Sequence, residues 1–337
     1  MHYLVTGHTG FKGAWLCMLL KSRGHKVSGI SLDPVNNSLF ENANVATLLE
    51  HDIRMDIRDS KSLKRVIGDV APEVVMHLAA QPLVRYSYRE PRETYETNVN
   101  GTLNVLEAVQ ATSTVKACLI ITTDKVYRNV NQVKGYVESD ALGGDDPYSA
   151  SKAMADILTQ SWVKSFPGVP TAVARAGNVI GGGDVCEDRL LPDVVRAFSS
   201  GSSLHIRYPD AVRPWQHVLD CLNGYLALVE KLLAGKGQGE WNFGPGPESF
   251  VSVGKMAELS QQMWAGKCDV VIDGRPTFHE ANLLALDSSK AQSKLGWGNK
   301  LVFPASLEWT LVWEQEVLAG RSAREACELQ LARFEAL

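Results

Sequence analysis

The chain has 337 residues and a formal net charge of −4 at pH 7; 45% of it is hydrophobic and 21% is charged. This is the balance of an ordinary globular protein, which excludes long disordered or low-complexity regions. The slight acidic excess argues against nucleic acid as a partner, because proteins that bind the phosphate backbone carry a basic surface. The length is that of two domains or one large one.

The sequence also predicts a cytoplasmic protein with no membrane partner and no metal site. Its longest apolar run covers only residues 14–20, far short of a transmembrane helix. Glycine comes too early in the opening MHYLVTGHTG for the apolar core of a signal peptide. The cysteines are scattered, without a CxxC pair or a Cys/His cluster at metal-ligand spacing. This pattern favours free thiols in a reducing compartment.

Short apolar segments alternate with amphipathic segments through the first two-thirds of the chain. The predicted strands are 2–6, 26–32, 73–78, 116–122 and 171–176. The predicted helices between them are 13–22, 60–70, 92–109 and 148–165. Alternation of this kind is typical of βαβ units, so it predicts an α/β fold. Helices would cover both faces of a doubly wound, parallel sheet of the Rossmann type.

A glycine-rich turn joins the first predicted strand to the first helix. Its sequence, GHTGFKG, has glycine at positions 7, 10 and 13. Glycine lets the backbone approach a pyrophosphate, which the helix N-terminus attracts. A flexible turn is the alternative, but Asp33 follows the second strand, where a carboxylate can bind both ribose hydroxyls and repel a 2′-phosphate. The pattern predicts NAD, held at Gly7, Gly10, Gly13 and Asp33.

A second group of residues indicates proton chemistry. Tyr148 and Lys152 lie four residues apart at the start of a predicted helix, so they project from one face. A neighbouring ammonium lowers the pKa of a phenol from its usual value of about 10 and makes it a usable base. A surface pair that arose by chance is the alternative. The catalytic interpretation is favoured because Thr123, Asp124 and Lys125 end a predicted strand, at the edge where such sheets bind ligands.

Beyond residue 176 glycine and proline become frequent and the alternation stops. Residues 177–188 are predicted to form a loop, and helical patterns return at 217–233, 253–265, 304–319 and 321–337. We therefore expect a Rossmann domain at 1–177 and a smaller mixed α/β domain at 178–337. The sequence leaves open whether residues 217–240 pack back on the first domain.

The chain resembles the extended branch of the short-chain dehydrogenase/reductase superfamily, and within it the CDP-glucose 4,6-dehydratases. The matching stretches are GHTGFKG from Gly7, HLAAQPLV from His77, DPYSASK from Asp146, ARAGNVIGGGD from Ala174, EDRLLPD from Glu187, RPWQHVLD from Arg213 and WNFGP from Trp241. Thr123, Tyr148 and Lys152 match the catalytic triad of the superfamily. Nucleotide-sugar 4,6-dehydratases generally follow this threonine with Asp-Glu. CDP-glucose 4,6-dehydratases have Asp-Lys, as this chain does at Asp124 and Lys125.

A few positions depart from the pattern of that family. Val185 and Cys186 stand where Trp-Ala is expected, Tyr208 stands where Asn is expected, and the strand end has TTDKVY instead of TSDKCY. Threonine keeps the hydroxyl of serine, so the triad is complete. Val185 and Tyr208 fall near the implied substrate pocket, which leaves the nucleobase of the substrate open.

The resemblance further implies the residues that line the two binding sites. Additional cofactor contacts are implied at Thr9, Phe11, Asp56, Ile57, Leu78, Ala79, Ala80, Asn98 and Thr122, besides Tyr148 and Lys152. Substrate contacts are implied at Gln81, Asn178, Arg189, Leu190, Arg207, Arg213, Trp215 and Arg275. Arginine suits a diphosphate because its guanidinium binds phosphate oxygens in pairs. Without the resemblance, solvated surface arginines would be the alternative.

The implied reaction is a redox-neutral dehydration of CDP-glucose or a related nucleotide sugar. Tyr148 takes the proton of the 4-hydroxyl as C4 passes hydride to NAD, water is eliminated from C5 and C6, and the hydride returns to C6. Asp124 and Lys125 are the implied acid and base of the elimination. The alternative for Lys125, which can be a base only if desolvation lowers its pKa, is that it only orients Asp124 while another group or ordered water moves the C5 proton. Asp124 can be that acid only if burial raises its pKa against the pull of the neighbouring ammonium.

Two alternatives to this function stay open at the level of the sequence. A 4-epimerase or reductase of the same superfamily would leave Asp124 and Lys125 idle. A regulator that binds NAD without catalysis would keep only the fold. The resemblance also implies a homodimer formed through the helices at 92–109 and 148–165.

Overall fold

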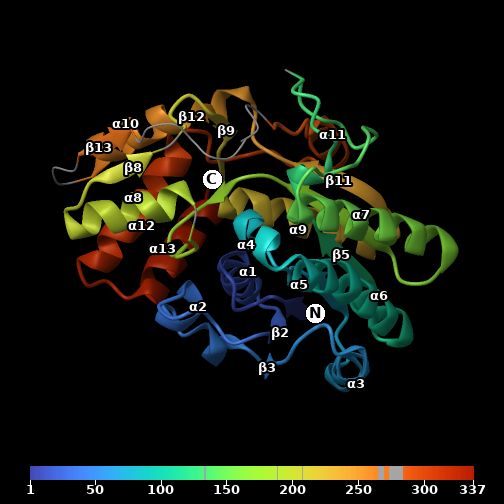
Figure 1. The fold of residues 1–337 in the computed structure, drawn as a ribbon. Helices are drawn as coiled ribbons and strands as arrows, with labels where there is room; N and C mark the ends of the chain where they lie inside the picture. The colour runs from blue at the N-terminus through green and yellow to red at the C-terminus, as the bar shows by residue number, and fades with distance from the viewer. Residues whose placement is uncertain (133, 188, 207, 265–268, 273–283) are drawn as a thin grey trace.

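A seven-stranded parallel sheet forms the centre of the molecule in the computed structural model, which describes all residues except 133, 188, 207, 265–268 and 273–283 (Figure 1). The strand order is β11-β6-β5-β4-β1-β2-β3. The strands are β1 (His2–Thr6), β2 (Lys26–Ser31), β3 (His51–Arg54), β4 (Val74–His77), β5 (Ala117–Ile121), β6 (Thr171–Ala176) and β11 (Gly239–Phe243). Every pairing is parallel, which confirms the predicted Rossmann-type sheet.

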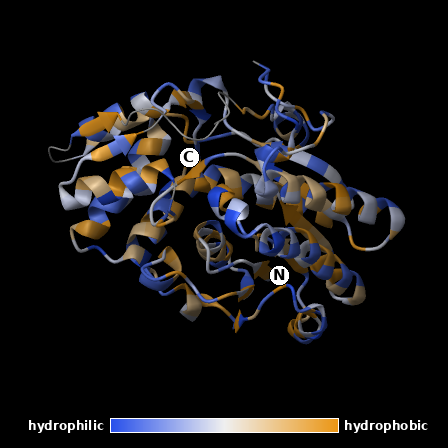
Figure 2. Ribbon diagram, viewed as in Figure 1, coloured by the Kyte–Doolittle hydropathy of each residue, from blue (hydrophilic) through white to orange (hydrophobic). Residues whose placement is uncertain are grey.

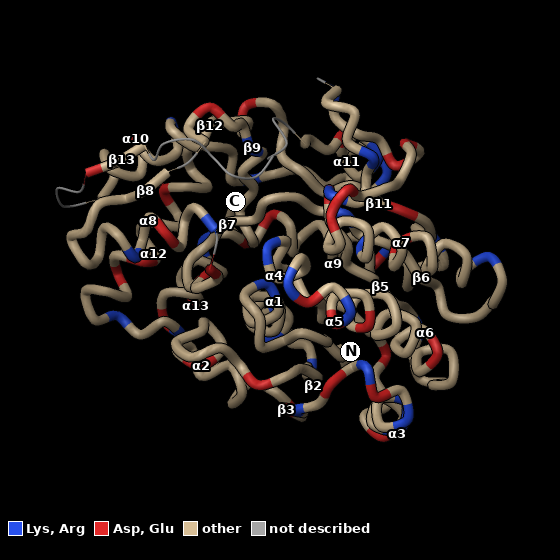
Figure 3. Tube along the Cα trace, in the orientation of Figure 1, with Lys and Arg blue, Asp and Glu red and all other residues tan. Residues whose placement is uncertain are grey.

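Two layers of helices cover the sheet, as expected for strands that are apolar on both faces. The central strands are buried along their length and are strongly hydrophobic (Figure 2). One apolar cluster joins them to α1 (Phe11–Ser22) and α9 (Val218–Leu233). A second cluster on the other face includes α3 (Ser60–Val70), α6 (Gly101–Ala111) and α7 (Pro147–Ser165). Charged residues of both signs are interspersed along the outer helices α3 and α5 (Figure 3).

The predicted helix 92–109 consists of three segments rather than one. They are α5 (Pro91–Tyr95), the π-helical turn η2 (Glu96–Asn100) and α6. The wide turn directs Asn98 inward, where its amide donates to the Ser151 hydroxyl of α7 at 2.8 Å. Irregular turns of this kind occur often at functional sites. Shorter elements between the strands are α2 (Leu39–Asn42), η1 (Val45–Leu48), α4 (Val84–Arg89) and η3 (Asp124–Val126).

The second half of the chain contributes to the sheet layers and also builds a region beside them. Strand β11 pairs with β6, and α9 shares its apolar cluster with α1, while the boundary near residue 177 stays a prediction. Three two-stranded sheets are β7 (Val179–Ile180) with β10 (Gln216–His217), β8 (Leu204–Ile206) with β13 (Val270–Ile272), and β9 (Val212–Pro214) with β12 (Phe250–Ser252). The remaining elements are α8 (Leu190–Ser200), η4 (Pro247–Ser249), α10 (Val253–Met263), α11 (Ser289–Leu295), α12 (Ala305–Leu318) and α13 (Ala323–Glu335).

The predicted loop at 177–188 is wrong at one point, because β7 lies within it and pairs with β10. A two-residue strand is too short to leave a periodic pattern in the sequence. Within the described part of the chain, no helix combines the length and apolar character needed to cross a bilayer.

Candidate active site

The glycine turn between β1 and α1 is fixed by close contacts of the backbone. Gly7 has a φ of +75°, and a Cβ on it would lie 2.7 Å from the backbone nitrogen of Ala79. A Cβ on Gly13 would overlap the carbonyl oxygen of Gly7. At Gly10, which precedes α1, a Cβ would meet only that same oxygen, at 3.4 Å. The turn therefore keeps open the space in front of the helix, and a dinucleotide pyrophosphate fits this cradle.

The carboxylate predicted to bind ribose lies beside a cation that sequence analysis missed. Asp33 follows β2 and its side chain is 90% exposed, with the Arg54 Nε atom 3.6 Å from its Oδ1. Arg54 is in turn paired with Asp52 at 2.8 Å. The Thr9 hydroxyl anchors the turn to the end of β2, through a hydrogen bond of 2.7 Å with the Ser31 hydroxyl. Asp33 is thus accessible to a ribose.

The other implied cofactor contacts line the same edge of the sheet. Asp56 forms an ion pair with Arg58 at 2.6 Å, and this hydrogen bond lowers the pKa of the carboxyl. Ile57 packs on Gly101, where a Cβ would lie 2.5 Å from its Cδ1. The segment after β4, which holds Leu78, Ala79 and Ala80, is tied to β1 because Ala79 N–H donates to the Thr6 hydroxyl at 3.2 Å. Phe11, at the start of α1, packs against the apolar cluster of that face.

Two hydrogen bonds join the Gln81 backbone to the Asn98 side chain. The Gln81 N–H donates to the Asn98 side-chain oxygen at 2.8 Å, and the Asn98 amide donates to the Gln81 carbonyl at 3.1 Å. The Gln81 amide donates to the Thr94 hydroxyl, and its oxygen accepts from the Leu83 N–H. These bonds brace the loop after β4 against η2, and the cofactor and substrate contacts predicted at the two residues stay predictions.

Three of the predicted catalytic residues meet where β5 ends and α7 begins. The Tyr148 N–H donates to the Ser87 hydroxyl at 3.1 Å, which fixes the first turn of α7. Burial raises the pKa of Tyr148 to about 12, against a hydrogen bond with Thr123 that lowers it. Lys152 directs its ammonium to the Ile121 carbonyl at 3.0 Å. The prediction that Lys152 lowers the pKa of Tyr148 is therefore wrong in this structure, because desolvation of the phenol dominates.

Lys152 itself is a buried amine. Burial lowers its pKa to about 8, and the nearby Lys12 cation acts in the same direction, while Asp156 opposes them. An ammonium with this pKa can exchange its proton near neutral pH. The residue is therefore suited to relay a proton as well as to carry a charge.

Asp124 is a buried carboxyl that the fold keeps close to Thr123. Desolvation raises its pKa, although the Lys125 cation beside it lowers it. The Thr123 hydroxyl donates to the Asp124 Oδ1 at 2.8 Å. A Cβ on Gly177 would lie 2.8 Å from the other carboxylate oxygen, so glycine is required to leave room for the acid. The raised pKa meets the condition under which Asp124 can act as an acid, its catalytic role stays a prediction, and Gly177 is a supporting residue that the sequence did not reveal.

Of the implied substrate residues, Arg189 lies near Tyr148. Arg189 precedes α8, is paired with Asp184 at 2.9 Å and is close enough for its cation to lower the pKa of Tyr148. Trp215 is buried and its indole N–H donates to the Val251 carbonyl at 3.0 Å, so it packs in the core. Arg213 lies on β9, Asn178 follows Gly177, and Leu190 begins α8. Arg207 and Arg275 lie outside the described residues.

Comparisons with known proteins agree with this geometry. The family described as GDP-mannose 4,6 dehydratase matches residues 4–309. The CDP-glucose 4,6-dehydratase of Salmonella typhimurium is 42% identical, over 94% of this chain and 91% of that protein. The chain belongs to this family of nucleotide-sugar 4,6-dehydratases. The dTDP-glucose 4,6-dehydratase of Neisseria meningitidis is 30% identical, over 92% of each chain.

Solved structures show that the family shares its fold with epimerases. The dTDP-glucose 4,6-dehydratase DesIV of Streptomyces venezuelae, with NAD and TYD bound, has a TM-score of 0.81 at 24% identity and covers 94% of this chain and 97% of its own. The UDP-glucose 4-epimerase of Brucella ovis, in complex with NAD, has the same TM-score at 22% identity, covering 92% and 96% of the two chains. Fold alone therefore does not separate a 4,6-dehydratase from an epimerase, and the side chains must do so.

Proposed function

We propose that the protein is an NAD-dependent hydro-lyase that converts CDP-glucose to CDP-4-dehydro-6-deoxyglucose and water. The observation that carries this proposal is the buried Asp124, whose raised pKa keeps it available as a proton donor beside Thr123 and Tyr148. A 4-epimerase eliminates no water and has no use for such an acid. CDP-glucose is favoured over other nucleotide sugars by the similarity of the whole chain to the Salmonella enzyme and by the Asp124-Lys125 pair.

The roles follow from the environments of the side chains. When bound, NAD supplies a hydride acceptor for C4 of the sugar and returns the hydride to C6. Tyr148 removes the proton of the 4-hydroxyl, and the Thr123 hydroxyl bonded to it holds the phenol in place. Lys152, whose lowered pKa makes its neutral amine accessible near neutral pH, takes up that proton in the neutral form and later returns it. Asp124 protonates the hydroxyl that leaves C6, while Lys125 removes the proton at C5 and gives a proton back to C5 when the hydride reaches C6.

The binding sites proposed are those that the glycine turn and the arginines suggest. The dinucleotide would lie on Gly7, Gly10 and Gly13 with its ribose at Asp33 and its nicotinamide towards Tyr148. The nucleotide diphosphate would be bound by Arg189, which Asp184 orients. The remaining contacts given above for the cofactor and the substrate keep the same assignments, except for Trp215, which packs in the core.

A panel of nucleoside-diphosphate glucoses tests the proposal. Each would be incubated with the purified protein, and the products would be analysed by mass spectrometry for the loss of one water. We expect this loss with CDP-glucose and slower or no conversion of the UDP, dTDP and GDP sugars. Conversion to an isomer of unchanged mass would instead establish an epimerase, and binding without conversion would favour a regulator.

We further propose a homodimer formed through the helices at 92–109 and 148–165, which are α5, η2, α6 and α7. Met154 and Ile157 on α7 are apolar and about half exposed, at 47% and 52%. They lie on the helix that packs against α5 and η2, and Met154 shares a hollow with Tyr95 and Val99. Ile157→Glu would place a charge on this face. Light scattering should give a dimer for the wild type and a monomer for the variant, whereas a dimeric variant would exclude this face as the interface.

A further inference from the structure

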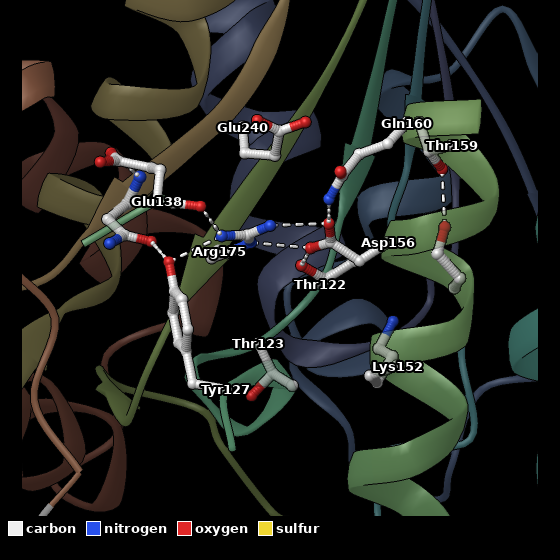
Figure 4. Close-up of polar contacts among 12 residues, drawn as sticks. Thr122, Thr123, Tyr127, Glu138, Lys152, Asp156, Thr159, Gln160, Arg175 and Glu240 are labelled. Carbon is white, nitrogen blue, oxygen red and sulfur yellow. Dashed lines mark hydrogen bonds and ion pairs between the residues drawn. The ribbon is translucent and has the colours of Figure 1, made fainter. Parts of the chain in front are cut away.

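A fully buried ion pair lies directly behind the proposed catalytic residues. Arg175 on β6 and Asp156 on α7 are both 0% exposed, and the guanidinium donates to the two carboxylate oxygens at 2.8 Å each (Figure 4). Moving both charges out of water is costly, and well-packed apolar residues often stabilise a core as well or better. Stability alone therefore does not explain the pair. The other hydrogen bonds of Arg175 and Asp156 indicate a role for it.

One end of the pair, Asp156, is linked by a hydrogen bond to the segment that holds the residues proposed for the redox steps. Asp156 lies one helical turn after Lys152 on α7, and its Oδ2 accepts a hydrogen bond from the Thr122 hydroxyl at 3.1 Å. Thr122 directly follows Ile121, the residue whose carbonyl accepts from the Lys152 ammonium. Helix α7 and the end of β5 are thus joined at two successive positions, one of which is the proposed proton relay.

The other end of the pair reaches the residues proposed for the elimination. The Arg175 Nη1 donates to the Tyr127 hydroxyl at 2.7 Å, and the Tyr127 ring lies under the guanidinium. Tyr127 directly follows η3, the short helix that contains Asp124 and Lys125, and its N–H donates to the Asp124 carbonyl at 3.3 Å. Arg175 is also two residues before Gly177, which leaves room for the Asp124 carboxyl.

We propose that Arg175 and Asp156, with Thr122 and Tyr127 as their two arms, are positioning residues that hold the redox residues and the elimination residues in one arrangement. None of the four acts on the sugar in this scheme, and the hydroxyl of Thr122, a residue implied above as a cofactor contact, is bonded to Asp156. Thr122 sets the distance between α7 and β5, and Tyr127 sets the position of η3. In the proposed reaction C4 reacts at the redox residues and C5 and C6 react at the elimination residues, so a shift of either arm should misalign one half-reaction and spare the other. This inference rests on the proposed function.

Each arm can be removed by a single substitution that leaves the ion pair between Arg175 and Asp156 in place. Tyr127→Phe removes the hydroxyl that accepts from Arg175 and donates to the Asn242 side-chain oxygen at 2.8 Å, and Tyr136→Phe is its matched control. Tyr136 stacks on the Tyr127 ring, but its hydroxyl donates to the Asn129 side-chain oxygen and accepts from the Val130 N–H. Thr122→Val removes the link from β5 to Asp156, and Thr159→Val is its control. Among the residues that the structure describes, the buried Thr159 hydroxyl on α7 bonds only the Ala155 carbonyl of its own helix.

Single-turnover mixing with CDP-glucose separates the two half-reactions. For Tyr127→Phe we expect fast formation of reduced nicotinamide followed by elimination slowed about 10-fold to 100-fold, the usual cost of losing a supporting contact. For Thr122→Val we expect slower nicotinamide reduction, with a shifted pH profile for that step, and Thr122→Ser should restore both. KM should change little in either variant. Rates equal to those of the two control variants would overturn the proposal.

Hydrogen exchange gives a second measure that needs no substrate. Backbone amides at 123–127 should exchange faster in Tyr127→Phe than in Tyr136→Phe, because only the first variant loses the bond that holds η3. Unchanged exchange in Tyr127→Phe would contradict the inference even if the protein proved to be an epimerase. If the wild type dehydrates CDP-glucose and the variants match their controls, the proposed function stands and this inference fails.

Discussion

The cofactor end and the reaction end of the active site differ in what fixes them. At the cofactor end, Gly7 and Gly13 are fixed by backbone contacts in which a single added Cβ would overlap neighbouring atoms. At the reaction end, Asp124, Tyr148 and Lys152 are buried, which raises the pKa of the first two side chains and lowers that of the third. A motif in the sequence records the first kind of constraint, whereas only the tertiary structure creates the second.

The largest effect should come from Tyr148→Phe. The variant keeps the ring and its packing but loses the hydroxyl proposed as the base, and the loss of a general base typically costs about 10²–10⁴-fold in rate. NAD binding, followed by quenching of tryptophan fluorescence, should be almost unchanged because the glycine turn is intact. A variant that turns over at a rate near that of the wild type would remove Tyr148 from the mechanism.

The next effect should come from Asp124→Asn, which separates the two halves of the reaction. Asparagine cannot protonate the leaving hydroxyl, so reduced nicotinamide should accumulate in a single turnover with little 4-keto-6-deoxy product, at a cost of about 10²-fold or more. In heavy water the wild-type product should carry deuterium at C5. Normal turnover of the variant, or a product without solvent hydrogen at C5, would contradict the proposed elimination.

The acid form of Asp124 also predicts a pH dependence. Because burial raises the pKa of this carboxyl, elimination should be fast while the group is protonated and slow down as the pH rises through its pKa. The rate of water loss in single-turnover experiments, measured across pH, tests this. An elimination rate that increases as the pH rises through the pKa of Asp124 would mean that another group is the proton donor.

The parts of the molecule that the sequence predicted well are those fixed by local patterns, and the parts it missed depend on tertiary packing. Strand β6 and helix α3 have the bounds that periodicity predicted, because their apolar patterns are strong. Strand β3 was missed: it lies at the sheet edge, is mostly exposed and carries polar residues. The glycine turn was identifiable from its spacing and position. The Arg175–Asp156 pair was not, because its partners meet only when α7 has packed beside β6.

At the cofactor end, Gly13→Ala should destabilise the fold by about 3 kcal/mol, since its Cβ would overlap backbone that has little room to move. NAD binding should weaken as well, because the turn must open. Gly68→Ala is the matched control: Gly68 lies in α3 with nothing within 4 Å of an added Cβ, and it should gain up to about 1 kcal/mol. Urea unfolding of both variants measures the contrast, and equal stabilities would show that the turn tolerates a side chain.

The smallest effect tests whether burial also raises the pKa of a carboxyl that the reaction does not use, as it raises that of Asp124. Glu314 on α12 accepts the Gly183 N–H at 2.7 Å, and burial raises its pKa to about 7 from its usual 4.5. Between these two pH values the folded Glu314 carboxyl keeps a proton that the unfolded one has lost, so the free energy of unfolding falls as the pH rises.

The variant Glu314→Gln cannot titrate and keeps an acceptor for the Gly183 N–H. Its stability relative to the wild type, from urea unfolding, should therefore increase by about 1–3 kcal/mol between pH 4.5 and pH values above 7. The exposed Glu308 of the same helix provides the control, Glu308→Gln, which should show no such increase. A difference that stays constant with pH would mean that Glu314 is hydrated and that burial does not govern carboxyls outside the reaction centre.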